Sequence, residues 1–516
     1  MAQSIAGTQL ATTWAANVAG VAIRVRADWN RDGDFVDAGE DVTSRVRAIQ
    51  ITHRIHSALA GLPLLGNIGP STATLVLSNA DRYFSPNNAS GIASVYTALA
   101  DGMYRIPVQI EMGYYNGATP EYLTQFVGEM EAPDESEDGH TATVTFECTD
   151  KATGLMQHKL TTGLMLDWRP DELLDEVLDE AGWTGTRSLD WALSIVPHGW
   201  LDDENAWDEL QSIAASDGGM FYVSKEGAAT FRRMTAVLER TDSRIGVAAL
   251  NQGNASAYRS TLSWRDTYSE VIYEYSGRYE VPPEEVWRAP RYIAVEPGET
   301  ATEEIRYRYP VLAAYAPVYD IDYRCVTSGG GILPEGAGGI TVGLESHAQA
   351  GTLTLTNDHL HQTAYVLNAQ VRGVPLQGEE AQTRRFESTL VSPLVEGKVW
   401  RSRGNPWLQT WEQAERMGGW MRDRLQRPRR LLVWRGPACP WIEMLDRVVL
   451  SHNTMTPNPG ESVHCYVVGN GMRYSAGAMW TQELILLPVT DLFAHTNYFI
   501  PGESYYADSG SHRTGY

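Results

Sequence analysis

The sequence predicts a mainly β fold with α+β modules: two β-barrel domains, a helix–helix–hairpin unit and an additional β module. Short runs of alternating apolar and polar residues fill the first 150 residues and return near the end of the chain. Between these regions the apolar period lengthens to that of a helix. The 516 residues exceed what one hydrophobic core holds, because a domain takes roughly 150 residues.

Residues 1–158 are predicted to form the first barrel domain. Runs such as VAIRVRA, ATLVLSN and TATVTFECT alternate with period 2, and the turn signals SPNNASG and YYNGATPE lie between such runs. In TATVTFECT, the side chains of Val144, Phe146 and Cys148 share one face. Several short strands at this spacing favour a small barrel or a sandwich.

Residues 159–255 are predicted to form an α/β domain, the helix–helix–hairpin unit. The run RPDELLDEVLDEAGW carries acidic residues in its first turn and Gly182 at the position of a C-terminal cap. A second helix is predicted in DDENAWDELQSIAASDGG. The following FYVSKEGAATFRRM has the pattern of a hairpin that turns at Glu226–Gly227.

The remaining residues are predicted to form three parts. Residues 256–280 and 396–495 are assigned to a second β-barrel/α+β domain, which contains a helix at about 408–427 that Pro428 ends. Residues 281–395, with many Pro and Gly turn signals, are assigned to an inserted β-sandwich-like module. Residues 496–516 have no strong period and are assigned to a C-terminal arm.

Charge and cysteine content exclude some classes of protein. The net charge of −23 disfavours nucleic-acid binding through a broad basic face. An acidic surface would repel DNA, which suits a passage through which DNA slides, and it is also common in ordinary soluble proteins. The four cysteines form no CxxC pair, so we expect neither a zinc knuckle nor a disulfide framework, but reduced, mostly buried thiols in a reducing cytoplasm. The sequence has no apolar run of about 18 residues, and its start does not resemble a signal peptide.

Motifs of common enzyme classes are missing. The sequence contains no GxSxG, HExxH or GxxxxGK[ST]. His359 and His361 could place two imidazoles on one strand face, but no third metal ligand follows at short spacing. Glu129 and Glu131 could serve as a carboxylate pair, although such pairs arise by chance in a chain with 64 acidic residues. We therefore expect no enzymatic activity.

The stretch DWNRDGDFVDAGEDV at 28–42 resembles a calcium-binding loop in part. Oxygen ligands at positions 1, 3 and 5 and a glycine at position 6 fit Asp28, Asn30, Asp32 and Gly33. The glutamate expected at position 12 comes one residue late, as Glu40, and the flanks have the pattern of strands. A β-hairpin variant would take its later ligands from Asp34, Asp37 or Glu40. The predicted Ca²⁺ ligands are Asp28, Asn30, Asp32, Asp34 and Glu40; the alternative is an Asx-rich turn that caps its own backbone amides.

Several stretches together resemble the baseplate hub or tail-tip hub proteins, also called minor tail proteins, of long-tailed bacteriophages and related tail-like particles. They are DWNRDGDFVDAGEDVTSRV, ATLVLSNADRYFSPNN, YLTQFVGEME followed by TATVTFECTDKATGL, AWDELQSIAASDGGMFYVSKEGAATFRRM and EQAERMGGWMRDRLQRP. The fourth is the most specific of the set. Residues 280–395 share less in this resemblance, and the C-terminal arm does not share in it.

The resemblance implies two similar barrels per subunit and a homotrimer whose barrels form a pseudo-sixfold ring at the virion tail tip. It implies as neighbours the distal tail protein ring, the C-terminus of the tape-measure protein and a central fibre or receptor-binding protein. The ring would close the tail tube and open on host attachment, so that genomic DNA passes without specific binding. Such a subunit would be synthesised in the host bacterial cytoplasm. Some members of the family carry domains that cut the cell wall; this sequence has no such motif, so a structural protein is expected.

Two other functions remain open from the sequence. A carbohydrate-binding or carbohydrate-active β-protein would use a face rich in the 16 tryptophans and 25 tyrosines. A secreted calcium-binding adhesin is disfavoured by the start of the sequence. We expect most tryptophans of the late region to be core or subunit interface and not ligand platforms; they are Trp400, Trp407, Trp411, Trp420, Trp434 and Trp441.

Overall fold

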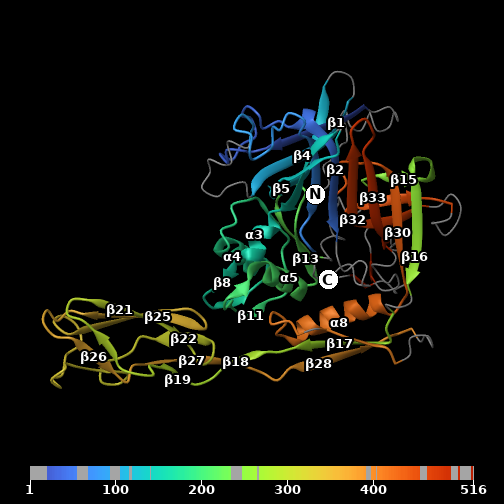
Figure 1. Ribbon diagram of the computed structural model, residues 1–516. Helices are drawn as coiled ribbons and strands as arrows, with labels where there is room; N and C mark the ends of the chain where they lie inside the picture. Colours follow the sequence, from blue (N-terminus) through green and yellow to red (C-terminus); the bar gives the residue numbers. More distant parts are fainter. Residues whose placement is uncertain are drawn as a thin grey trace.

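The computed structural model confirms the mainly β fold and consists of a body that carries a long arm (Figure 1). It describes residues 20–54, 68–92, 105–115, 119–139, 141–233, 247–263, 267–390, 397–402, 404–453 and 462–489, with short segments at 498–499 and 513–514. Those two segments pair as β34 (Tyr498–Phe499) and β35 (Arg513–Thr514); the rest of the predicted C-terminal arm lies outside the described residues. No helix in the described part of the chain combines the length and apolar character needed to span a membrane.

The first barrel comprises the N-terminal strands of a 13-stranded sheet. These strands are β1 (Gly20–Ala27), β2 (Val46–Arg54), β3 (Thr72–Ser78), β4 (Ile106–Tyr115), β5 (Pro120–Met130), β6 (Asp134–Glu137) and β7 (Ala142–Asp150). Their ladder order is β1-β4-β5-β7-β3-β2, with β6 paired to β7. Alternate residues point into one core, as in β3, where Ala73, Leu75 and Leu77 are buried.

The residues before β2 close this barrel. The N–H of Ala27 donates to the carbonyl of Glu40 (2.9 Å), and the N–H of Val42 donates to the carbonyl of Val25 (3.0 Å). The edge of β1 that does not pair with β4 thereby pairs with residues 40–42. The chain then enters β2 through the short 3₁₀ turn η1 (Thr43–Arg45). We call this pairing of β1 with residues 40–42 the seam of the first barrel. The acidic stretch 28–42 is the loop that brings the chain back to this seam.

The second barrel repeats the strand order of the first. It contains β15 (Ala249–Asn251), β16 (Ala257–Ser263), β30 (Arg429–Pro437), β31 (Arg447–Ser451), β32 (Val463–Ser475) and β33 (Thr481–Pro488). When the six main strands of each barrel are numbered along the chain, both ladders run 1-4-5-6-3-2. The neighbouring pairs match in direction except the first, which is antiparallel for β1–β4 and parallel for β15–β31.

Strand β32 belongs to both barrels. Its residues 463–466 pair with β31, and its residues 469–475 pair with β2 over seven positions, from Arg54↔Gly469 to Ala48↔Ser475. A bulge between Val467 and Gly469 in its ladder with β33 separates the two halves. Met472 and Trp480 thereby enter the core of the first barrel.

The helix–helix–hairpin unit spans 152–233 and lies between the two barrels in the sequence. It comprises α3 (Ala152–Gln157), β8 (Lys159–Leu160), β9 (Met165–Trp168), α4 (Pro170–Glu180), β10 (Arg187–Leu189), β11 (Val196–Gly199), β12 (Glu204–Asn205), α5 (Ala206–Ser216), β13 (Gly219–Val223) and β14 (Ala229–Arg233). The Asn205 side chain accepts the N–H of Asp208 and caps α5. Gly182, after α4, has φ +70°, as expected of a C-terminal glycine.

A small domain attaches the arm to the body. It packs α8 (Trp411–Leu425) on β17 (Glu270–Tyr275), β28 (Gln382–Glu387) and β29 (Val399–Arg401). Thr410 and Gln413 form a capping box at the start of α8. We call this part the ribbon domain, because β17 and β28 run on into the arm as a pair of strands (Figure 1).

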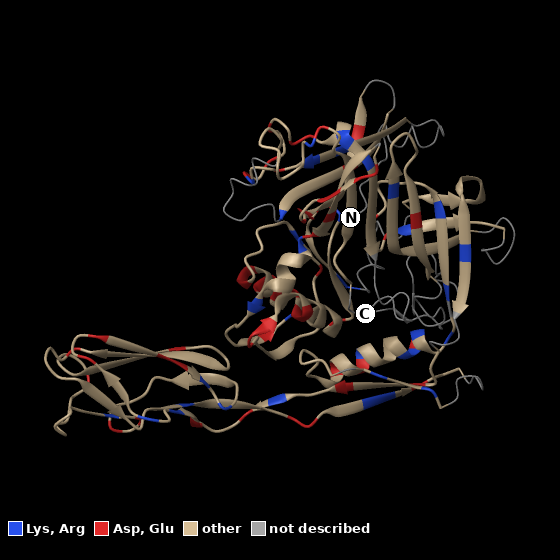
Figure 2. Cartoon of the chain, viewed as in Figure 1, with Lys and Arg blue, Asp and Glu red and all other residues tan. Residues whose placement is uncertain are grey.

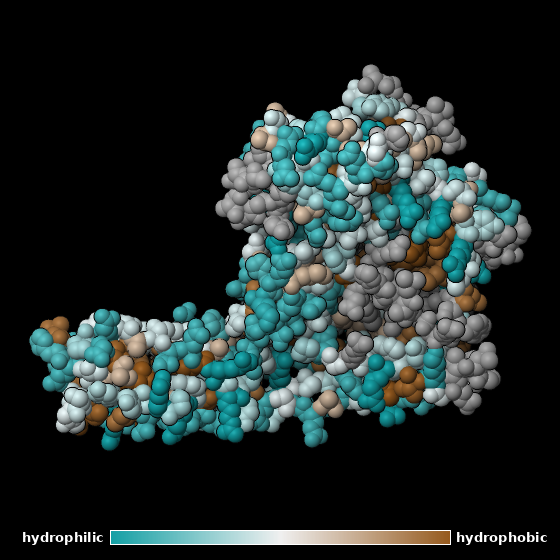
Figure 3. Space-filling view, viewed as in Figure 1, coloured by the Kyte–Doolittle hydropathy of each residue, from teal (hydrophilic) through white to brown (hydrophobic). Residues whose placement is uncertain are grey.

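The arm is a β module with its own core. It contains β18 (Arg278–Glu280), β19 (Glu284–Arg288), β20 (Ile293–Val295), β21 (Thr300–Arg306), β22 (Val311–Tyr315), β23 (Arg324–Val326), β24 (Ile340–Ser346), β25 (Ala350–Asn357), β26 (Ala364–Leu367) and β27 (Gln370–Gly378). Three small sheets enclose one apolar cluster that includes Ile305, Leu353 and Val371. Figure 3 shows apolar residues on the surface at the end of the arm that lies farthest from the body.

The structure divides the chain differently from the sequence prediction at two places. Strand β15 belongs to the second barrel although it lies before residue 256. Strand β17 and helix α8, assigned to the second barrel from the sequence, form the ribbon domain with β28, which had been assigned to the inserted module. The reason is physical: an alternating run such as EVIYEY specifies a strand but not its partner.

The four cysteines and three of the six late tryptophans are buried. Cys148, Cys325, Cys439 and Cys465 are buried, as expected from the sequence. Trp407, Trp434 and Trp441 are buried, Trp400 and Trp420 are partly buried, and Trp411 is 51% exposed. These six residues do not line one open groove.

The β4–β5 ladder leaves no room for a side chain at Gly113. A Cβ atom there would lie 1.9 Å from the carbonyl oxygen of Glu121. We expect Gly113→Ala to lower the stability of the first barrel by about 1–3 kcal/mol, because the strands must separate. Thermal unfolding and hydrogen exchange of β4 and β5 would measure this. Gly343→Ala in β24 is the control, since its Cβ would be 3.8 Å from the nearest atom; equal effects of the two changes would contradict the explanation.

Candidate functional site

The acidic loop begins inside the first barrel and ends on its seam. Asp28 directly follows β1 and is only 2% exposed. Trp29 fixes the loop, because its ring packs near Phe84 and Phe146 and its indole N–H donates to the carbonyl of Gly39 (3.0 Å). A buried carboxylate at this point needs compensation by donors or by positive charge.

Part of that compensation comes from backbone amides. The Asp28 carboxylate accepts the N–H groups of Asp32 (3.2 Å) and Gly33 (3.0 Å). Asp32 and Asp34 in turn accept the N–H groups two residues ahead of them. The Asx-turn alternative considered from the sequence therefore describes much of the loop.

Three of the five predicted ligands lie together. Carboxylate oxygens of Asp28, Asp32 and Glu40 are within 4.8 Å of one another, and among the described residues no other group of three Asp, Glu, His or Cys does this. Asn30 is tied to the neighbouring acids: its amide nitrogen donates to Asp32 (2.9 Å) and Asp37 (2.7 Å), and its amide oxygen accepts the N–H of Asp32 (3.4 Å). Asp34 lies outside the group and faces the N–H of Val36.

Glu40 is the least compensated member of the group. Its side chain is 2% exposed; Oε2 accepts the N–H of Asp37 (2.9 Å), while Oε1 is buried without a hydrogen-bond partner among the residues that the structure describes. Burial raises the pKa of Glu40, and the nearby charges of Asp28, Asp37 and Asp32 raise it further. The fold thus concentrates negative charge at the seam.

A second candidate site lies where the two barrels meet the helix–helix–hairpin unit. The carbonyl of Pro440, in the second barrel, accepts the Lys225 ammonium (2.8 Å) and the Gln125 amide (2.9 Å). Lys225 is at the tip of the β13–β14 hairpin and is 5% exposed; its Nζ is 3.9 Å from a carboxylate oxygen of Glu443. Burial lowers the pKa of Lys225, and the charge of Glu443 partly offsets this.

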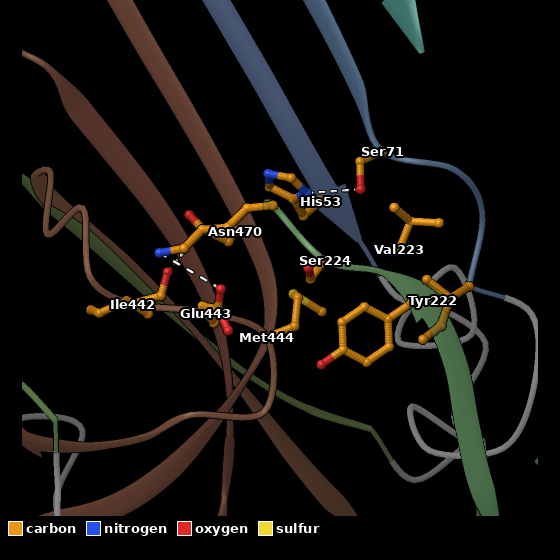
Figure 4. A pocket seen from close by; sticks show the side chains of 11 residues that line it. His53, Ser71, Tyr222, Val223, Ser224, Ile442, Glu443, Met444 and Asn470 are labelled. Carbon is orange, nitrogen blue, oxygen red and sulfur yellow. Dashed lines mark hydrogen bonds and ion pairs between the residues drawn. The ribbon is translucent and has the colours of Figure 1, made fainter. Parts of the chain in front are cut away.

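A small cavity lies at this junction (Figure 4). Its walls come from the first barrel (His53, Ser71), the hairpin (Tyr222) and the second barrel (Glu443, Asn470). A volume of about 20 Å³ leaves room for roughly one water molecule. The junction therefore serves to hold three parts of the chain together, and the cavity is too small for a substrate.

His53 and Asp150 are buried near the wall residue Ser71. Burial lowers the pKa of His53 to about 4, and its two ring nitrogens lie 2.8 Å from Ser71 Oγ and 3.1 Å from the carbonyl of Gln125. Burial raises the pKa of Asp150 to about 7, although the N–H groups of Ser71 and Ala152 donate to it. Sequence patterns do not reveal these roles, since Lys225 lies in an ordinary turn signal and Asp150 ends an ordinary strand.

A larger groove lies between the helix–helix–hairpin unit and the base of the arm. It has a volume of about 450 Å³ and is lined by Trp200, Arg278 and Tyr309, among others. Such a groove is where the carbohydrate-binding alternative would apply. However, the Arg278 guanidinium lies 3.8 Å from the centre of the Trp200 ring and donates to the carbonyl of His198 (2.6 Å), so one face of this ring is already occupied.

The other sequence candidates do not form sites of their own. His359 Nδ1 accepts the N–H groups of His361 and Gln362 and so stabilises its own turn. Glu129 lies 3.9 Å from Arg105. Neither pair belongs to a group of three potential metal ligands in the described part of the chain.

No family model and no curated protein matches the chain. Three solved structures resemble it over most of its length. A 43 kDa tail protein of prophage MuSo2 from Shewanella oneidensis is 11% identical, with a TM-score of 0.47, covering 90% of this chain and 98% of that one. The tail protein from Neisseria meningitidis MC58 is 9% identical, with a TM-score of 0.49 and coverages of 91% and 97%. Prophage tail protein gp18 from Listeria monocytogenes EGD-e is 7% identical, with a TM-score of 0.40 and coverages of 90% and 94%. All three are described as tail proteins, the class of protein that stretches of this sequence resemble.

The buried ammonium of Lys225 gives a prediction for the junction. We expect Lys225→Met to destabilise the docking of the hairpin by about 3–5 kcal/mol, because Glu443 then loses its positive partner. Adding Glu443→Gln should restore part of the loss, and a double-mutant cycle by chemical denaturation would measure the coupling. Lys159→Met, which breaks the exposed pair with Asp203, is the control and should leave stability unchanged.

Asp150 gives a prediction for pH dependence. Its pKa rises from 3.8 to about 7 on folding, so the folded state binds the proton more tightly. This stabilising contribution is full below pH 3.8 and is lost as the pH rises through 7. We expect the wild-type unfolding midpoint to increase between pH 8 and pH 6, and Asp150→Asn to reduce this increase. Identical pH profiles of the two proteins would refute the assignment.

Proposed function

We propose that the chain is a structural subunit of a phage-type tail, and that three copies form the hub ring at the tail tip. The carrying observation is that one chain holds two barrels with the same strand order in a single continuous sheet. Three such chains provide six like barrels around one axis. A ring of this kind fits a sixfold tube on one side and threefold components on the other.

The outer strand of the second barrel supports assembly. Strand β16 ends the 13-stranded sheet, so one of its edges pairs with no other strand among the described residues. Residues 257–262 are exposed on both faces of the strand, and Tyr258 (47%) and Leu262 (50%) are large apolar side chains on one of these faces. An exposed edge strand is a site where another chain adds to a sheet, and a neighbouring copy in the ring would cover it.

The charge of the chain fits a tube through which DNA moves. Acidic residues gather on the helix–helix–hairpin unit (Figure 2), and α4 alone carries Asp171, Glu172, Asp175, Glu176, Asp179 and Glu180. With a net charge of −23, the subunit offers phosphates little to bind. DNA would pass without specific contacts.

The remaining parts of the proposal follow the sequence resemblance. The hub would be made in the host bacterial cytoplasm and reside at the virion tail tip. It would contact the distal tail protein ring, the tape-measure C-terminus and a central fibre or receptor-binding protein, and would open on host attachment. We assign it no catalytic role. The arm, which exposes Ile332 and Leu360, gives the subunit a projecting surface for one of these neighbours.

Assembly can be tested through β16. We expect the purified chain to have three times the monomer mass by light scattering or native mass spectrometry. Leu262→Lys should weaken the trimer, because it places a charge beside the free edge. Leu166→Lys, at an exposed position of the helix–helix–hairpin unit, is the control and should leave the trimer intact.

Two results would contradict the proposal. The first is a stable monomer at all concentrations, above all one that binds glycans, which would support the carbohydrate-binding alternative. The second is the absence of antibody label for this chain at the tail tip of virions in negative stain.

A further inference from the structure

We propose that the loop between β1 and η1 binds a hard divalent cation, of which Ca²⁺ is the best fit, through the carboxylates of Asp28, Asp32 and Glu40. Their oxygens lie within 4.8 Å of one another. One ion placed among them can contact all three, because Ca²⁺–oxygen distances are about 2.3–2.6 Å. Without an ion, three like charges repel each other in a partly buried place.

The unpartnered oxygen of Glu40 is the independent observation for this site. Glu40 Oε2 already accepts the N–H of Asp37, whereas Oε1 is buried and has no hydrogen-bond partner in the described part of the chain. Buried carboxylate oxygens are normally paired, since water is not available to solvate them. The charged side chains that act on this carboxyl are Asp28, Asp37 and Asp32, all of the same sign. A cation supplies the missing partner.

The chemistry of the donors selects the kind of ion. All three side chains are carboxylates, and neither histidine nor cysteine belongs to the group. Oxygen-only donors suit Ca²⁺ or Mg²⁺ and not the softer transition metals. An irregular loop, with Gly33 and Gly39 at positive φ, adapts to the larger and less regular shell of Ca²⁺. Water and loop carbonyls would complete the shell.

The position of the ligands gives the ion a role in closing the barrel. Asp28 follows Ala27, the last residue of β1. On the other side of the seam, the backbone carbonyl of Glu40 accepts the N–H of Ala27. An ion held by both residues therefore ties together the two sides of the seam. This inference does not depend on the proposed ring, because it concerns one chain.

The full chain can be tested with Ca²⁺ alone. We expect calorimetry to detect a site and thermal unfolding to shift upward when Ca²⁺ replaces a chelator. Tb³⁺ should bind in place of Ca²⁺ and show emission sensitised by Trp29, which adjoins Asp28. Mg²⁺ should bind more weakly than Ca²⁺.

Matched variants distinguish a cation site from an ordinary acidic turn. Glu40→Gln should weaken Ca²⁺ binding by at least about tenfold and remove the thermal shift. In chelator, the same variant should be at least as stable as wild type, because it removes a repelled carboxylate. Asp32→Asn, at an exposed ligand, should also lose the Ca²⁺ effect and provides the test if Glu40→Gln does not fold. Asp34→Asn, an exposed neighbour outside the group, should behave as wild type.

Two outcomes would overturn the proposal. One is an unchanged unfolding temperature with no Ca²⁺ or Tb³⁺ binding by the wild-type chain. The other is a loss of binding in Asp34→Asn as large as that in Glu40→Gln, which would indicate diffuse attraction to the acidic loop.

Discussion

The pairing of β2 with β32 is the contact on which the rest of the body depends. Seven consecutive residue pairs join a strand of the first barrel to one of the second. Met472 of β32 and Trp480, which comes after the end of β32, both lie in the core of the first barrel. The Tyr114 hydroxyl donates to the carbonyl of Ala438 (2.6 Å) across the same boundary. The barrels therefore share a sheet and part of a core, and neither is complete without the other. Because these partners are hundreds of residues apart, this boundary forms only after long loops close, which slows folding.

The helix–helix–hairpin unit reinforces this boundary from the side. Its hairpin tip places Lys225 against the carbonyl of Pro440, which also accepts Gln125 of the first barrel. Burial of a lysine is costly unless its ammonium is hydrogen-bonded and paired with a negative charge. Here the ammonium is held by a carbonyl and a nearby carboxylate, so it fixes the orientation of three parts at one point. The cost of burial makes this a specific contact, because a shifted hairpin would leave the charge without partners.

The sequence predicts elements well where local chemistry decides them. Helix α5 starts at an Asn205 cap and stops before Gly218, and α8 lies within the predicted 408–427. Partners are decided by distant residues, and prediction fails there: EVIYEY specifies a strand, yet only the fold shows that β17 pairs with β28. The acidic loop shows both cases. Its composition predicts clustered carboxylates, but which of them meet depends on the turn. Asn30 turns its amide nitrogen to the acids, and Asp34 faces the N–H of Val36, which leaves Asp28, Asp32 and Glu40 together.

The repeated strand order also explains where the arm could be inserted. In each barrel the second and third strands are neighbours, as β2–β3 and β16–β30. The link between them occupies 55–71 in the first barrel, whereas in the second it spans 264–428 and carries the ribbon domain and the arm. A link of any length between two adjacent strands leaves the ladder intact. The entropic cost of closing such a link rises only slowly with the number of residues in it. In the proposed ring, six equivalent links would alternate between short and long. The barrels would then keep sixfold likeness where they meet the tube, while the three arms would impose threefold symmetry elsewhere. In that ring, one repeated fold with one unequal insertion would be sufficient to convert sixfold into threefold symmetry.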